Sequence, residues 1–125
     1  MRGEMSTIIG GKEFNWKSQT FVMGVINVTP DSFSGDGIDL NVDLAVKKAV
    51  EFEKQGCHIL DIGGESTRPS ITYETASTTS IEVEENRVIP AIKAISKAVA
   101  IPISVDTYKA SIAEKAIDAG ASLVN

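Results

Sequence analysis

The feature that most constrains the fold of this chain is a regular alternation between short apolar runs and segments with helical periodicity. Phe21–Ile26 is a nearly continuous apolar run, as expected for a strand that is buried on both faces. His58–Ile62 and Ile101–Val105 read as a second and a third strand, and residues 121–124 begin a fourth. Strands that alternate with helices form βαβ units with right-handed crossovers. The sequence therefore predicts an α/β fold with a parallel sheet.

A helix is expected after each of the first three strands. Val42–Val50 has apolar residues at helical spacing, with Asn41 as its N-cap and Gly56 as its stop. The second helical segment contains Pro90, which should kink or split it, because proline lacks the donor N–H and clashes with the preceding turn. Residues 112–117 mark a third helix.

Residues 1–19 are expected to form an amino-terminal hairpin within the same domain. Two short strand-like runs flank the dipeptide Gly10-Gly11, which favours a tight turn. Phe14 and Trp16 are interpreted as residues that cover a core rather than bind a ligand. No linker-like stretch divides the chain.

The composition excludes several classes of function. The chain has 125 residues, with 17 acidic side chains against 12 Lys and Arg, which gives a formal net charge of −5. This acidic balance argues against general binding to nucleic acid or to an anionic membrane. No apolar run approaches the roughly 18 residues that span a bilayer. A single cysteine, Cys57, cannot form an internal disulfide, and we expect a cytoplasmic protein.

Polar side chains stand at or near the end of each predicted strand: Asn27, Asp61, Asp106 and Asn125. Ligands of parallel α/β folds bind at the carboxyl ends of the strands, so four such groups predict a polar pocket. A carboxylate accepts hydrogen bonds from two adjacent N–H groups, and an amide offers one donor and one acceptor face. Asp106 and Asn125 together therefore suit a flat heterocycle.

Structural roles are possible for each of these residues taken singly. Asn27 could start a turn before Pro30, and Asp106 could cap the helix that follows it. Asp61 is interpreted as a structural carboxylate that bonds to neighbouring backbone. Only the four together favour a pocket.

Two loops carry further candidates. Residues 27–37 join small residues to one aromatic side chain, Phe33. Residues 63–69 place two hydroxyls beside Arg68 after a pair of glycines. The arginine fork suits phosphate, and glycine-rich turns let backbone N–H groups approach an anion, although Arg68 could equally be a solvated loop charge.

Several stretches of the chain resemble the dihydropteroate synthase family. They read MGVINVTPDSFSGDG (Met23–Gly37), LDIGGESTRP (Leu60–Pro69), EENRVIPAI (Glu84–Ile92) and ISVDTYKASIAEKAIDAGASLVN (Ile103–Asn125). The resemblance implies a (β/α)8 TIM barrel of the pterin-binding type, of which residues 1–125 would supply the first half. Enzymes of this family join 6-hydroxymethyl-7,8-dihydropterin pyrophosphate to p-aminobenzoate with Mg²⁺, which yields 7,8-dihydropteroate and pyrophosphate in folate biosynthesis.

The resemblance also implies roles for single residues. The substrate-binding positions are Asn27, Phe33, Ser66, Thr67, Pro69, Asp106 and Asn125. Within this set Asn27 matches the contact to pyrophosphate and metal, and Asp106 and Asn125 match contacts to the pterin ring. Arg68 matches a catalytic position in the second loop. The family commonly reads SFSDGG where this chain reads SFSGDG, so we hypothesise that Asp36 replaces a catalytic carboxylate usually found at position 35.

The implied partners are the two small-molecule substrates, with sulfonamides as inhibitors, and no nucleic acid or membrane. A half-barrel would leave two open strand edges, so a homodimer or a self-associating fragment is expected. A barrel of this kind needs about 250 residues, so the chain alone is expected to lack synthase activity. Two alternatives stay open: a corrinoid-linked pterin-binding methyltransferase and a non-catalytic half-barrel fragment.

Overall fold

The computed structural model describes residues 5–28, 38–64 and 81–125, and it confirms the predicted alternation of strands and helices. The four strands β3 to β6 form one sheet in chain order, and all of their pairings are parallel. Among the described residues, no helix is long and apolar enough to cross a membrane. In chain order the elements are β1 (Ser6–Ile9), β2 (Lys12–Asn15), β3 (Met23–Asn27), α1 (Ile38–Lys54), β4 (Ile59–Gly63), α2 (Ile81–Ala98), β5 (Ile103–Asp106), α3 (Ala110–Ala119) and β6 (Leu123–Val124).

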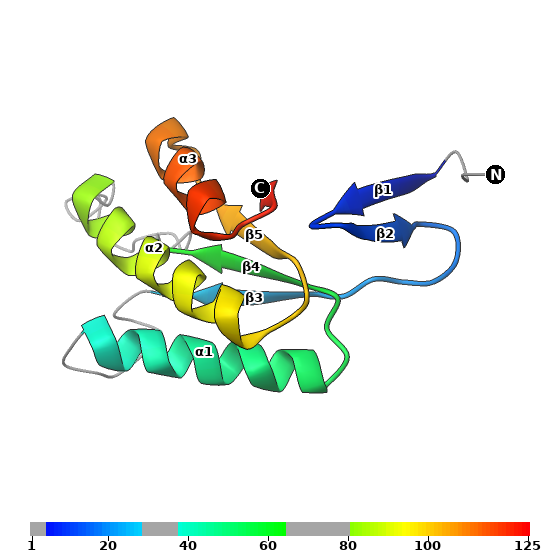
Figure 1. The fold of residues 1–125 in the computed structure, drawn as a ribbon, viewed down its shortest axis with the longest axis horizontal. Coiled ribbons are helices and arrows are strands. Elements are labelled where there is room, and N and C mark those ends of the chain that lie inside the picture. The colour runs from blue at the N-terminus through cyan, green and yellow to red at the C-terminus, as the bar shows by residue number, and fades with distance from the viewer. Residues whose placement is uncertain (1–4, 29–37, 65–80) are drawn as a thin grey trace, which may run out of the picture.

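The predicted amino-terminal hairpin is present as the antiparallel pair β1–β2. Gly10 and Gly11 connect the strands with φ angles of 58° and 78°, the left-handed region that a tight two-residue hairpin turn requires. The hairpin lies at the amino-terminal ends of the parallel strands (Figure 1). There Phe14 is buried, whereas Trp16 is 44% exposed and stacks against it with ring centroids 5.6 Å apart. Of the two aromatic residues, therefore, Phe14 is the one that belongs to a core.

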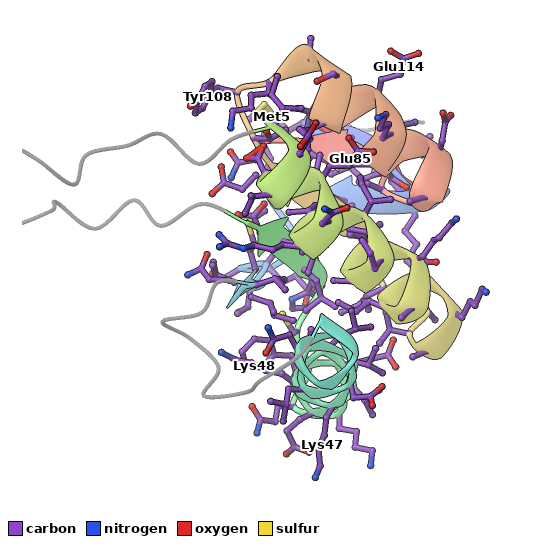
Figure 2. All side chains as sticks on the ribbon, turned by 90° about the vertical axis from the view of Figure 1, so that its left-hand side faces the viewer. Met5, Lys47, Lys48, Glu85, Tyr108 and Glu114 are labelled. Atoms are coloured by element: carbon purple, nitrogen blue, oxygen red, sulfur yellow. The ribbon has the colours of Figure 1, made fainter. Side chains whose placement is uncertain are left out.

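Helices α1, α2 and α3 pack on one face of the parallel sheet, as Figure 2 shows along the strands. Because strand side chains alternate between the two faces, every second residue of each strand points toward these helices. The resulting core contains the strand residues Ile26, Leu60, Ile62, Ile103 and Val105 and the helix residues Ala45, Ala49, Val88, Ala91, Ile92, Ile95, Ala116 and Ala119.

The opposite face of the sheet, here called the inner face, carries the other alternating set. By register it consists of Met23, Val25, Asn27, Ile59, Asp61, Gly63, Ser104, Asp106, Leu123 and Asn125. The hairpin covers its amino-terminal end, where Ile9 and Phe14 pack with Ile59, Phe21 and Leu123. The polar members of the inner face therefore lie toward the carboxyl end, away from the hairpin.

The prediction that the first strand is buried on both faces is wrong. Met23 and Val25 of β3 are 40% and 50% exposed, whereas Ile26 is fully buried. The helices cover only one face of the sheet, and β3 is an edge strand whose inner-face side chains receive no full cover from the described residues.

Two helix predictions also need correction. Helix α1 begins at Ile38, so Asn41 lies within its first turns instead of capping it. The sequence offers no glycine or proline between positions 38 and 41, and nothing there stops the helix from starting earlier. Helix α2 runs unbroken through Pro90, so the expected split is wrong, while a kink there stays a prediction. The proline removes a single intrahelical hydrogen bond, while Val88, Ala91 and neighbouring residues hold the helix in the core.

Candidate functional site

Asn27 and Asp106 converge on Gly63 at the carboxyl end of the sheet. Gly63 pairs with Asn27 of β3 on one side and with Asp106 of β5 on the other. A Cβ atom added at Gly63 would lie 3.5 Å from Asn27 Oδ1, 3.4 Å from Asp106 Cβ and 3.5 Å from Asp106 Oδ2. An amide and a carboxylate thus flank a position that carries no side chain.

Asn125 joins this group through the last strand. Its backbone N–H donates to the Val105 carbonyl oxygen at 2.8 Å, which continues the pairing of β5 with β6. Its side-chain nitrogen donates to Asp61 Oδ2 at 3.2 Å. Asp61 is only 3% exposed, and among the described residues the donor to its carboxylate is this side-chain amide and not the neighbouring backbone that the sequence suggests. The amide group of Asn125 is therefore held in one orientation.

Asn27, Asp106 and Asn125 form the rim of the candidate site. Below this rim the inner face stays polar. Asp61 pairs in register with Ser104, which is fully buried. Asp61 Oδ1 and Ser104 Oγ have no hydrogen-bond partner among the parts of the chain that the structure describes. Burying polar atoms without partners is costly, so these two atoms favour a ligand or an ordered water at this depth. The site has a polar floor beneath a polar rim.

The four strand-end residues thus lie on one face, as the sequence predicts. Asn27 and Asn125 are exposed and Asp106 is half-buried, so the rim is accessible. The N-cap of α3 is Lys109, which removes the alternative that Asp106 caps that helix. The remaining candidates lie outside the described residues; they are Phe33, Asp36, Ser66, Thr67, Arg68 and Pro69.

Among the described residues, the candidate site offers the oxygen atoms of Asn27 and Asp106 as possible ligands of a metal ion. The described residues contain no group of three or more His, Cys, Asp or Glu side chains that could hold one. Mg²⁺ prefers oxygen ligands and is often bound through one or two protein oxygens together with substrate phosphates. Asn27 Oδ1, on the other side of Gly63 from the Asp106 carboxylate, is compatible with that mode.

Sequence reasoning missed a buried acidic residue next to the site. Glu84, in the first turn of α2, is 1% exposed and contacts Thr107 and Lys109 just after β5. The signal was present, because Glu84 precedes Val88 by four residues and so falls on the apolar face of the helix. A charged side chain that lies on the buried apolar face of a helix needs a hydrogen-bonding or charged partner.

Residues 23–125 match the family of pterin binding enzymes. The chain is 52% identical over 117 residues to the dihydropteroate synthase of Clostridium beijerinckii, covering 94% of this chain and 42% of that protein. It is 51% identical over 111 residues to the Bacillus subtilis dihydropteroate synthase, covering 89% of this chain and 37% of that protein. The chain therefore spans about two fifths of the length of the curated relatives it matches.

Solved structures agree with these sequence matches. A dihydropteroate synthase of Xanthomonas albilineans with 4-aminobenzoic acid superposes with a TM-score of 0.83 at 39% identity, over 97% of this chain and 42% of that one. A Yersinia pestis dihydropteroate synthase in complex with a sulfonamide drug gives 0.80 at 39% identity, with the same two coverages. The predicted α/β barrel class, present here as a partial barrel, is confirmed. With 103 matched residues out of 125 (positions 23 to 125), the chain belongs to the family of pterin binding enzymes.

Proposed function

We propose that the polypeptide containing this chain is a dihydropteroate synthase. It would join 6-hydroxymethyl-7,8-dihydropterin pyrophosphate to p-aminobenzoate, with release of pyrophosphate. The observation that carries the proposal is the convergence of Asn27, Asp106 and Asn125 at the carboxyl end of the sheet, in a chain about half identical to proteins of that name.

The rim has the hydrogen-bonding capacity that a pterin ring requires. Asp106 accepts from two adjacent N–H groups, as the 2-amino group and the neighbouring ring nitrogen provide. Asn125 donates to Asp61, so its amide oxygen is turned away from that carboxylate and is available as an acceptor. A site lined with such groups rejects rings that leave them unpaired.

The proposed reaction proceeds by departure of pyrophosphate before attack. The C–O bond breaks with its electron pair on the pyrophosphate oxygen, and the aniline nitrogen then forms the C–N bond and loses a proton. Electrostatic stabilisation of the charge that develops is the main demand on the protein. From the family resemblance, roles in this chemistry are proposed for Asn27, Phe33, Asp36, Ser66, Thr67, Arg68 and Pro69.

We propose that Asn27 holds Mg²⁺ through its amide oxygen, together with the substrate's phosphates. Bound there, the ion would neutralise part of the charge on the leaving group. Asn27 Oδ1 and the Asp106 carboxylate flank Gly63 at the carboxyl end of the sheet, and this placement of two oxygen donors supports the assignment. An Asn27→Leu variant should therefore need more Mg²⁺ for pyrophosphate binding than for binding of a pterin without phosphates, as measured by calorimetry.

The experiment that tests the function is a condensation assay on the polypeptide carrying residues 1–125 in its natural length. Labelled p-aminobenzoate should be converted to dihydropteroate only with the pterin pyrophosphate present, and Asp106→Asn should remove that turnover. Methyl transfer to a corrinoid protein without condensation would establish the alternative methyltransferase. The isolated 125-residue chain, which covers 42% of its relative, should show no turnover.

Self-association and a cytoplasmic location are also proposed. The β3 strand presents an unpaired edge in the described sheet, and its residues Met23 and Val25, together with Val22 just before it, are at least 40% exposed. Exposed apolar edge strands favour pairing with another chain. Light scattering on the isolated 125-residue chain should report a dimer or larger species, and a monodisperse monomer would contradict the proposed self-association. The single cysteine fits a reducing compartment.

A further inference from the structure

Glu84 is a buried carboxylate whose partners come from the segment that follows β5. The Thr107 hydroxyl lies 3.1 Å from Glu84 Oε2 and 3.4 Å from Oε1. The Lys109 ammonium lies 3.7 Å from Glu84 Oε2. Removing a carboxylate from water is expensive unless it is paired and hydrogen-bonded, and here a hydroxyl and a cation provide that pairing. The contact therefore constrains the segment as well as the glutamate.

The direction of these hydrogen bonds follows from the chemistry of the groups. An ionised carboxylate only accepts, so the Thr107 hydroxyl must donate to Glu84. Its oxygen can then accept the Lys109 backbone N–H, which lies 3.2 Å away. Lys109 is the N-cap of α3 and makes no side-chain capping bond of its own. Glu84 thus orients the hydroxyl that holds the turn between β5 and α3.

The same part of α2 also contacts the end of β4. Arg87 Nη1 donates to the Gly64 carbonyl oxygen at 3.1 Å. A Cβ atom at Gly64 would lie only 2.5 Å from Val88 Cγ2, so the helix approaches the backbone closely. Helix α2 therefore contacts the segments directly after both β4 and β5. These are the two strands that place Gly63 and Asp106 at the rim.

We propose that Glu84 is a positioning residue for Asp106. Glu84 contacts Thr107, the residue next to Asp106, and so fixes the backbone conformation of the segment that follows β5. This conformation in turn determines the direction in which the Asp106 carboxylate points across Gly63. The assignment rests on the proposed pterin function for the identity of the ligand, but the structural link from Glu84 to Lys109 is independent of it.

The test compares four variants of the natural-length polypeptide. Glu84→Gln removes the charge, and Thr107→Val removes the hydroxyl at constant shape. Thr107→Ser restores the hydroxyl. Glu85→Gln is the matched control, because Glu85 is the next residue on α2 and makes an ion pair with Lys115 at 2.7 Å. Figure 2 labels Glu85 on the helix.

Two readouts separate positioning from a general loss of stability. The first is the ratio of affinities for 6-hydroxymethylpterin and for its analogue with oxygen in place of the 2-amino group, both measured by calorimetry on each variant. We expect the ratio to fall about fivefold in Glu84→Gln and Thr107→Val, a typical size for coupled neighbours, and to hold in Thr107→Ser and Glu85→Gln. The second is hydrogen exchange of the Lys109 amide without ligand, which should accelerate in the first two variants only.

Each outcome decides a different claim. An unchanged affinity ratio in both Glu84→Gln and Thr107→Val, with pterin still bound, would overturn the positioning role. Unchanged exchange at the Lys109 amide would overturn it even without a ligand. Failure of the unsubstituted protein to bind the pterin would overturn the proposed function instead, while altered exchange in the variants would still support the link to the β5 exit.

Discussion

The side-chain nitrogen of Asn125 lies 3.2 Å from Asp61 Oδ2, which joins the last strand of the sheet to the middle of β4 across two strand pairings. Asp61 is buried, and this amide is its donor among the described residues. The contact therefore serves two purposes. It partners a buried carboxylate, and it fixes the orientation of the Asn125 amide.

Removing the Asn125 amide should destabilise the fold. In Asn125→Ala the Asp61 carboxylate loses its donor, and leaving such a group buried and unpaired costs about 1–3 kcal/mol. Asn125→Asp should cost more, because it places a second negative charge beside Asp61. Urea unfolding measures both. Asn27→Ala is the control, with a change within about 0.5 kcal/mol, and equal stability of all three variants would contradict the account.

The two adjacent glycines after β4 should respond differently to alanine. At Gly64 the added Cβ would meet Val88 Cγ2 at 2.5 Å, so Gly64→Ala should destabilise the fold by about 1–3 kcal/mol through overpacking. At Gly63 the nearest atoms lie at ordinary contact distance, so Gly63→Ala should fold normally. Its methyl group would instead occupy the space between Asn27 and Asp106 and weaken pterin binding.

Thermal unfolding and calorimetry on this glycine pair provide the check. The expected result is one variant with low stability and one with normal stability but weak binding. If Gly63→Ala bound the pterin as tightly as the unsubstituted protein, the space above Gly63 would not be the ligand site.

Glu53 should stabilise the turn that leads into β5. Its Oε2 accepts the backbone N–H groups of Ala100 at 2.6 Å and Ile101 at 3.2 Å, which ties the end of α1 to this turn. Glu53→Ala leaves both donors without this partner and should cost about 1–3 kcal/mol in urea unfolding. Glu53→Gln should cost less, since an amide oxygen still accepts. An effect no larger than that of Glu51→Ala, on the exposed side of the same helix, would refute this role.

Phe14 should be the main anchor of the hairpin. It is 4% exposed and packs against Phe21 with ring centroids 4.9 Å apart, within the small core that also contains Ile59. Phe14→Ala should destabilise the protein by about 3–5 kcal/mol. Trp16→Ala should cost clearly less, because Trp16 is 44% exposed whereas Phe14 is 4% exposed. Equal losses in calorimetric scans of the two variants would show that the hairpin is not anchored through Phe14.

Much of this architecture is predictable from local patterns. The apolar runs and the helical spacing each have a period, and the glycine pair at 10 and 11 has a defined turn chemistry, so these elements appear in the expected order. The polar residues at the strand ends follow from the rule for parallel sheets. The exposure of Val25 does not, because an apolar run cannot reveal which face of an edge strand is left uncovered.

Contacts between distant residues were beyond local patterns. Asp61 and Asn125 are 64 positions apart, and only the sheet register brings them together. Glu84 and Thr107 are 23 positions apart, and an isolated acidic residue in a helix reads as solvated unless its phase with Val88 is noticed. Candidates in the two loops, such as Phe33 and Arg68, stay predictions.

Pterin binding at the carboxyl end of the inner face can be followed residue by residue. The isotopically labelled protein is titrated with 6-hydroxymethylpterin, and the amide and side-chain NMR shifts are recorded. The largest shifts are expected at Asn27, Gly63, Asp106 and Asn125, with the hairpin around Phe14 unchanged. Shifts confined to the hairpin end, or none at saturating pterin, would contradict it.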